Sequence, residues 1–390
     1  MLGVAKNLIH YGGMKKRDMK KRDIGLDLTR IVAFVSVVSI HFFLNSGYYD
    51  APVVGKRMYI MTLGRTFFGI CVPLFMLLSG YLMINKSISI EKRAIFSYYK
   101  KISKVLGTYI VATGFIIVYK IVILHDVLNI KGILLNLLGY NQYSWYVNMY
   151  IGLYLLIPLL NLLWNSIEDK NGHVLLVCIL LTMTVLPSVF NVYNFEEQRM
   201  LVRPYLTTTY NKLVPDWWTG IYPITYYYIG AYIKHHVEIK KVNTKKVFAV
   251  LIGTILLFGI NNIWRSYSRG FFWGIWCDWG SLQDTAETIL VFLLINSIDY
   301  KTNDNISKLV AKISDLTFGA YILSWIPDNI FYPKMIGRVP EIQSRMKYCV
   351  LMVLIVVIVA LVLSWGVQIV QQILKIVVHK IRKMPYKGKE

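Results

Sequence analysis

Two ionisable residues lie on the same side of one apolar segment near the start of the chain. Arg30 and His41 are eleven residues apart in the stretch DLTRIVAFVSVVSIH, which begins at Asp27. Eleven residues make about three helical turns, so the two side chains share a face, about 16 Å apart along the axis. Asp27 precedes Arg30 by three residues and can pair with it. Because a buried cation costs about 2.5–3.5 kcal/mol in a membrane span, we expect this face to be functional.

The composition is typical of a membrane protein. Of the 390 residues, 56% are hydrophobic and only 16% are charged, and the mean hydropathy is +0.49. Apolar runs of about 18 residues or more recur, which is enough to cross a bilayer as a helix. We therefore expect an all-α polytopic membrane protein with about ten transmembrane helices. The predicted spans are 24–45, 59–84, 101–124, 142–164, 173–192, 218–234, 246–264, 281–298, 313–332 and 347–378.

The distribution of basic residues predicts the orientation of the chain. The net charge of +22 does not indicate nucleic-acid binding, because Lys and Arg lie in short segments between apolar runs. An even number of spans places both termini on the Lys-rich side, which is expected to be cytosolic. We predict a cytosolic basic N-terminal arm (1–23), a transmembrane domain (24–378) and a cytosolic basic tail (379–390) without a further domain. The lipid bilayer is then the first partner, and the richness in Lys, Ile, Asn and Tyr favours a bacterial plasma membrane.

Polar residues in later spans fall at the depth of His41 if the spans alternate in direction. Asp284 and Glu287 are three residues apart and share a helix face. Together these residues predict a polar outer vestibule that contains His41. The others are Arg65, Trp145, Asn148, Ser324 and Trp325. Each type also has a common alternative role: an interfacial His, an Arg that extends to headgroups, or a Trp in the aromatic belt.

Several segments resemble the acyltransferase 3 family of integral-membrane acyltransferases. The first-span signature of that family is an Arg or Lys followed, after ten residues, by a His. Arg30 and His41 match this signature. The other similar segments, in the same order as in the family, are VPLFMLLSGYLM (72–83), KKISK (100–104), SWYVNMYIGLYLLIPLL (144–160) and ISDLTFGAYILSW (313–325). One departure is that family members often have His after the Tyr-Leu-Ile run, where this chain has Ser324 and Trp325.

The resemblance implies an activity. Family members move an acyl group, commonly acetyl, from cytosolic acyl-CoA to a carbohydrate hydroxyl at or beyond the outer membrane face. The expected donor is acetyl-CoA, and the expected acceptor is a capsule, exopolysaccharide, teichoic acid or lipid-linked glycan. The polyanionic donor is expected to dock on basic residues of the cytosolic side. These are Lys92, Arg93, Lys100, Lys101 and Lys104.

Acyl transfer to a hydroxyl needs a base, and imidazole, with an ordinary pKa of about 6.5, suits that task. We assign this role to His41, with Asp284 or Glu287 to orient it and with Arg65, Asn148 or Trp145 to stabilise the tetrahedral intermediate. Arg30 would line the path of the pantetheine arm. The four cysteines show no zinc-site spacing, and no metal is expected. A secondary transporter or a flippase for a sugar-containing substrate is the alternative, since such proteins also have about ten spans and intramembrane charges.

Overall fold

The computed structural model describes residues 22–86, 91–138 and 143–383. Within these ranges the chain is helical, with one isolated β-bridge between Val53 and Tyr267. The all-α prediction is therefore confirmed for the described residues. Most of the expected N-terminal arm and the last residues of the expected tail lie outside them. The longer helices are α2 (Ile24–Asn45), α3 (Lys56–Phe68), α4 (Cys71–Met83), α5 (Lys92–Lys100), α6 (Ser103–Val122), α7 (Ile130–Leu138), α8 (Trp145–Asn165), α9 (Lys170–Thr184), α11 (Tyr222–His236), α12 (Thr244–Ser266), α13 (Leu282–Ser297), α14 (Asp304–Leu323), α15 (Trp325–Arg338) and α17 (Cys349–Lys383).

Six helical stretches in the described part are long and apolar enough to cross a membrane, or up to seven if the bent pair α14–α15 is one span. Three further predicted spans coincide with the shorter helices α9, α11 and α13, which have 15, 15 and 16 residues. A straight helix needs about 20 residues to cross the hydrocarbon core. The chain therefore has the helices of a multi-span membrane protein, while the count of about ten and the cytosolic termini stay predictions.

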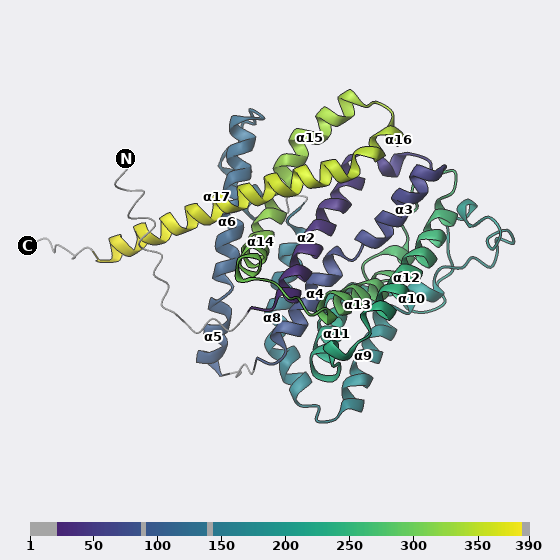
Figure 1. Ribbon diagram of the computed structural model, residues 1–390, viewed down its shortest axis with the longest axis horizontal. Helices are drawn as coiled ribbons and strands as arrows, with labels where there is room; N and C mark the ends of the chain where they lie inside the picture. The colour runs from purple at the N-terminus through teal and green to yellow at the C-terminus, as the bar shows by residue number, and fades with distance from the viewer. Residues whose placement is uncertain (1–21, 87–90, 139–142, 384–390) are drawn as a thin grey trace, which may run out of the picture.

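Helix α2 runs through the centre of the bundle (Figure 1). The side chain of Asp23 caps its start by accepting hydrogen bonds from the backbone N–H groups of Gly25 and Leu26. The helix packs against α3, α4, α13, α14 and α17, and most of its residues from Ala33 to Phe43 are buried. Because α2 is covered on several sides by other helices, its polar residues face protein or a cavity rather than lipid.

Helices α4 and α11 cross at two glycines. A Cβ atom on Gly80 would clash with the backbone carbonyl of Tyr227, and one on Gly230 would clash with the carbonyl of Leu77. The missing side chains let the two backbones approach closely, as small residues do in membrane helix pairs. This contact fixes α11 against the wall of the bundle that α4 forms.

Two predicted spans are broken helices. In the predicted span 59–84 the break lies at Gly69 and Ile70, between α3 and α4. Prolines often kink helices, but Pro73 occupies the first turn of α4, where no intrahelical N–H bond is needed. The span 313–332 divides at Ser324, where α14 and α15 meet at a bend of 62°.

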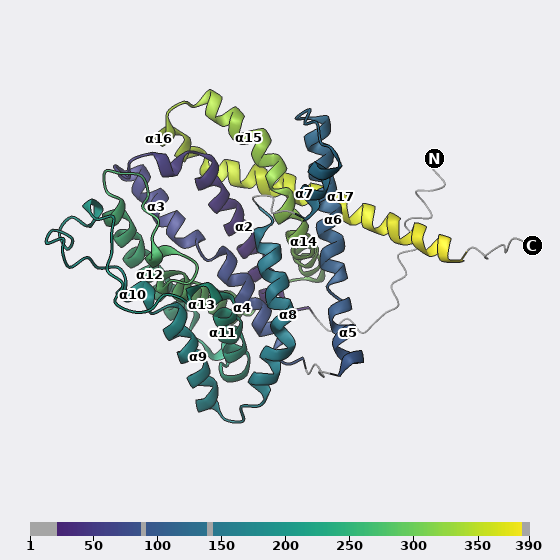
Figure 2. The same cartoon turned by 180° about the vertical axis from the view of Figure 1, so that it is seen from behind.

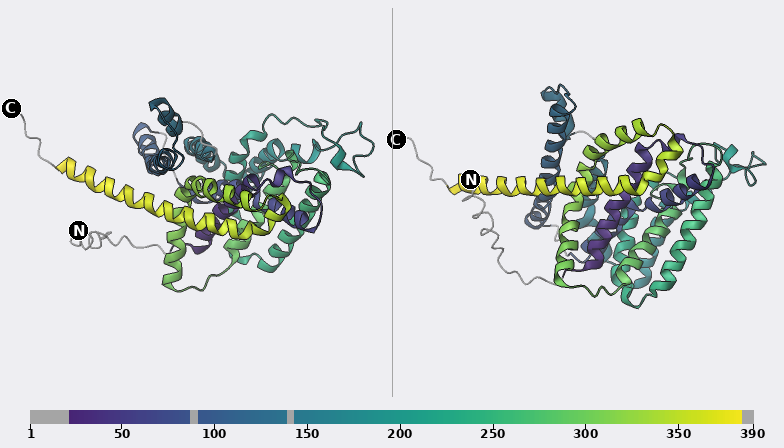
Figure 3. Two further views of the ribbon diagram at one scale, coloured as in Figure 1. Left: turned by 90° about the horizontal axis from the view of Figure 1, so that it is seen from above. Right: turned by 45° about the horizontal axis from the view of Figure 1, so that its top comes forward.

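The outer helices carry the apolar surface. Exposed large hydrophobic residues are frequent on α6, α8, α12 and α17, as expected of helices that face lipid. Helices α5, α6 and α8 lie on the side of the molecule seen in Figure 2. Helix α17 crosses the bundle and its last turns extend beyond it (Figure 3).

Candidate functional site

His41 lies against a carboxylate from the broken span. The Nδ1 atom of His41 is 3.6 Å from Oδ2 of Asp328 in the first turn of α15, and both side chains are buried. The ring of Tyr143 stacks on the imidazole with centroids 3.8 Å apart, and its hydroxyl donates to the same Asp328 oxygen at 2.7 Å. Asn45, one helical turn after His41, donates to the Tyr143 hydroxyl at 2.8 Å. The histidine is therefore held by stacking beside the carboxyl group of Asp328.

The atoms of this cluster are not fully paired. Within the described residues, Nδ1 of His41, Oδ1 of Asp328 and the hydroxyl of Tyr332 are buried and have no hydrogen-bond partner. Unpaired buried polar atoms are costly and are found where a reaction or a ligand needs them. A neutral imidazole with one nitrogen turned to a carboxylate can take a proton on the other nitrogen and be stabilised as imidazolium.

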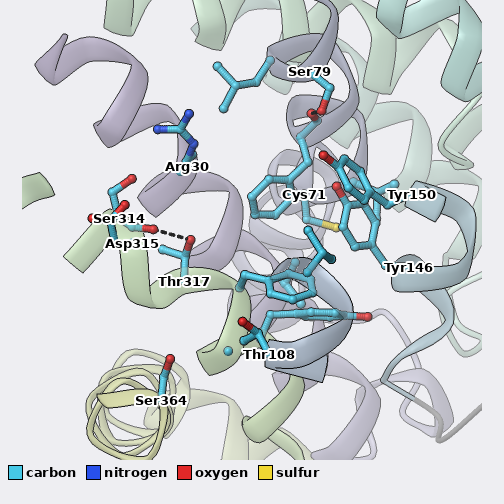
Figure 4. Close-up of a pocket in the computed structure, with 18 of the residues that line it drawn as sticks. Arg30, Cys71, Ser79, Thr108, Tyr146, Tyr150, Ser314, Asp315, Thr317 and Ser364 are labelled. Carbon is cyan, nitrogen blue, oxygen red and sulfur yellow. Dashed lines mark hydrogen bonds between the residues drawn. The ribbon is translucent and has the colours of Figure 1, made fainter. Parts of the chain in front are cut away.

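A single cavity of about 1020 Å³ reaches all three ionisable residues of α2, Asp27, Arg30 and His41. Its lining includes Arg30 and His41, and also Lys86 and Lys104. Figure 4 shows side chains around this space that come from helices distant in sequence, among them Arg30 and Tyr146. The shared face of α2 that the spacing predicts therefore borders one continuous cavity.

The charge of Arg30 is balanced where it meets the cavity. Its Nη1 atom is 2.8 Å from Oδ1 of Asp27, as the spacing predicts. Asp27 is also paired with Arg22, with Nε and Oδ2 2.7 Å apart, and accepts from the hydroxyl of Ser314 at 2.8 Å. Arg22 in turn pairs with Asp315 at 2.7 Å. Both guanidinium groups are thus paired with carboxylates, and Asp23, which caps α2, also lines the cavity here, so this wall carries no excess positive charge.

Aromatic residues form another part of the wall. Trp145, at the start of α8, stacks on Trp279 with centroids 4.6 Å apart. Trp273 meets Trp279 edge-on at 6.4 Å, and all three indoles line the cavity. Flat apolar faces with N–H groups at their edges are suited to sugar rings and hydroxyls.

The other charged residues expected beside His41 form no pair with it in the described residues. The guanidinium of Arg65 is buried, 4.3 Å from the ring of Trp273, and its Nε donates to the Tyr49 hydroxyl at 3.2 Å. Asp284 and Glu287 are also buried, and neither forms a hydrogen bond or ion pair with His41 in the described chain. The carboxylate that the structure places beside His41 is that of Asp328, on α15.

The basic residues near the start of α6 are exposed. Lys92, Arg93 and Lys100 lie on α5, and Lys101 joins it to α6. Of the five predicted donor-binding residues only Lys104 lines the cavity; Lys86, which the sequence did not single out, lines it too. Burial lowers the pKa of Lys86, and the nearby Lys101 adds to the effect. We call the part of the cavity at Lys86 and Lys104 its basic mouth. An anion bound there would offset the repulsion between the ammonium groups of Lys86 and Lys101.

The remaining predicted substrate residues do not border the cavity. Trp325 turns toward α6, where the Lys120 ammonium lies 5.2 Å from its ring. Ser324 is buried at the bend and its hydroxyl donates to the Tyr321 carbonyl at 2.8 Å. Asn148 lies on α8, half-buried, outside the cavity lining.

Sequence reasoning missed several side chains that face the site. Asp328 lay inside a predicted span, and a carboxylate in such a place is itself a signal of function. Gln368 and Gln371, in the apolar run of α17, line the cavity and carry the same signal. Tyr143 gave no such signal, because a tyrosine at the start of the predicted span 142–164 is typical of any membrane helix end. No group of three or more His, Cys, Asp or Glu suited to a metal occurs in the part of the chain that the structure describes.

Apolar helices around a cavity that charged and aromatic side chains share define a membrane protein with its candidate site inside the bundle. The family can be stated as well: a family model described as an acyltransferase domain (Acyl_transf_3) matches residues 23–365, nearly the whole chain. The chain therefore belongs to the acyltransferase 3 family. No curated protein and no solved structure matches it.

Proposed function

We propose that this protein is a membrane O-acyltransferase that moves an acyl group, most simply acetyl, from acyl-CoA to a hydroxyl of a cell-surface or exported carbohydrate. One observation carries the proposal: in a chain of this family, the cavity that holds His41 beside Asp328 also reaches Arg30 and the lysines of the mouth. A donor that enters at the lysines and an acceptor at His41 would then share one space.

His41 is the proposed base. Its Nε2 takes the proton of the acceptor hydroxyl, and the hydroxyl oxygen attacks the thioester carbonyl. Asp328, 3.6 Å from Nδ1, stabilises the imidazolium that forms. The tetrahedral intermediate collapses with cleavage of the carbon–sulfur bond, and the CoA thiolate takes the proton from His41. Trp145 is the proposed hydrogen-bond donor to the intermediate, since it alone of the three expected donors lines the cavity.

The phosphates of the donor are expected at the mouth rather than beside Arg30. Lys86 and Lys104 line the cavity there, and Lys101 is close enough to affect the pKa of Lys86. The guanidinium of Arg30 is already paired with Asp27. We therefore assign Arg30 to the path of the uncharged arm and the lysines to the phosphates.

Mass spectrometry of surface glycans tests the function. Cells that carry the wild-type chain are expected to show one acyl mass unit that is lost in His41→Ala, with normal insertion of the variant in the membrane. His379→Ala is the matched control, because His379 is exposed on α17. Retention of the acyl group in His41→Ala would remove His41 from the mechanism. Solute movement that does not depend on acyl-CoA would favour the transporter alternative.

A further inference from the structure

The last long helix turns a polar stripe toward the cavity. Ser364, Gln368 and Gln371 are spaced four and three residues apart and so lie on one face of α17. All three line the cavity. The same helix contains the most apolar of the candidate membrane spans. Two amide side chains in such a helix would be costly against lipid, so their place at the cavity indicates a use.

The hydrogen bonds of these amides are one-sided. The Nε2 atom of Gln371 donates to the hydroxyl of Thr108 at 3.0 Å, and that of Gln368 donates to the carbonyl of Asp315 at 3.3 Å. No hydrogen bond reaches the Oε1 atom of either glutamine within the described residues. Each side chain is thus anchored by its NH₂ group and keeps an acceptor available to a ligand.

The position of the stripe fits the middle of a long donor. Thr108 is one turn beyond Lys104 on α6, and its hydroxyl donates to the Lys104 carbonyl at 3.2 Å. Gln371, which contacts Thr108, therefore lies next to the basic mouth. Gln368 follows along the helix, about 4.5 Å further along the axis. The two arginines of the neighbouring wall, Arg22 and Arg30, are already paired with carboxylates, so this part of the cavity suits an uncharged, hydrogen-bonding segment.

We propose that Gln368 and Gln371 accept hydrogen bonds from the two amide N–H groups of a phosphopantetheine arm. The inference rests on the proposed function and adds the residues that select the donor. In this arrangement the lysines hold the phosphates, the glutamines hold the arm, and the thioester is carried toward His41. An acyl donor without these amides would lose the glutamine contacts and bind less tightly.

Calorimetric titration of the full chain in lipid nanodiscs tests this with two probes. Coenzyme A carries the arm, and its nucleotide half, adenosine 3′-phosphate 5′-diphosphate, does not. We expect the double variant Gln368→Leu/Gln371→Leu to bind coenzyme A about tenfold more weakly or worse, with unchanged affinity for the nucleotide. Gln372→Leu is the control, because Gln372 is exposed and lies outside the cavity lining.

The outcomes separate the inference from the function. Wild-type protein that binds no coenzyme A would overturn the proposed function. Wild-type binding that the double variant keeps would overturn only the role of the glutamines, as would an equal loss for both probes. Acyl carrier proteins present the same arm, and titration with holo-acyl carrier protein shows which source binds. A glutamine-dependent affinity for either one supports the inference.

Discussion

Asp328→Asn is the sharpest test of the proposed chemistry. The substitution keeps the shape of the side chain and its contact with Tyr143 but removes the charge that lies 3.6 Å from His41 Nδ1. At an effective dielectric constant of about 20, a charge pair at that distance is worth roughly 4.6 kcal/mol, part of which a neutral amide dipole would replace. The imidazolium exists only after proton transfer, so the loss falls on the transition state. The rate should fall on the order of a thousandfold.

The assay is release of CoA thiol in proteoliposomes, with surface glycan from cells lacking the gene as the acceptor. The expected pattern is a lower kcat with an unchanged KM for acyl-CoA, because the donor phosphates bind at the mouth. Asp304→Asn is the control, since Asp304 is exposed at the start of α14. An Asp328→Asn enzyme with a third or more of the wild-type rate, while His41→Ala is inactive, would refute the pairing.

Three other perturbations have defined outcomes. Gly230→Ala should prevent accumulation of folded protein, because its Cβ would meet the backbone of α4, whereas Gly253→Ala, with open space around it, should be neutral in a detergent melting assay. Lys104→Gln should weaken coenzyme A binding and flatten its dependence on salt concentration, since it removes a cation from the mouth. Burial, with the neighbouring ring of His236, lowers the pKa of His235. The contribution of neutral His235 to folding stability is therefore fully present above the ordinary pKa of about 6.5 and is lost as the pH falls below it. Melting temperatures at pH 7.5 and 5.5 should show a decline for the wild-type protein and a smaller decline for His235→Gln.

Much of the fold followed from hydropathy alone. The predicted first span, 24–45, coincides with α2 (Ile24–Asn45), because a long apolar run bounded by polar residues has few other solutions. The breaks at Gly69 and Ser324 did not follow. The length of an apolar run shows whether a helix can cross the bilayer. A bend depends instead on whether neighbouring helices supply hydrogen-bond partners to the backbone groups that it frees.

For the site residues, the sequence predicted only their depth along the membrane normal. Counting residues along alternating spans gave a depth, and on that basis Asp284, Glu287 and Arg65 were grouped with His41. Residues at one depth are spread around the whole bundle, and which of them meet depends on helix packing. Asp328 was missed because the span 313–332 was treated as one straight helix, which hides the bend before that residue.

The bend at Ser324 also constrains how such a site can vary. The carboxylate beside His41 is supplied by the second half of a broken helix, so its direction depends on the register at the junction. Inserting a single residue there would rotate α15 by about 100° and carry Asp328 away from the imidazole. In a relative whose helix is unbroken at this place, the acidic partner of the histidine must therefore come from another element. Comparing which relatives have an acidic residue at the position of Asp328 would then show, from sequences alone, which of them have the bend.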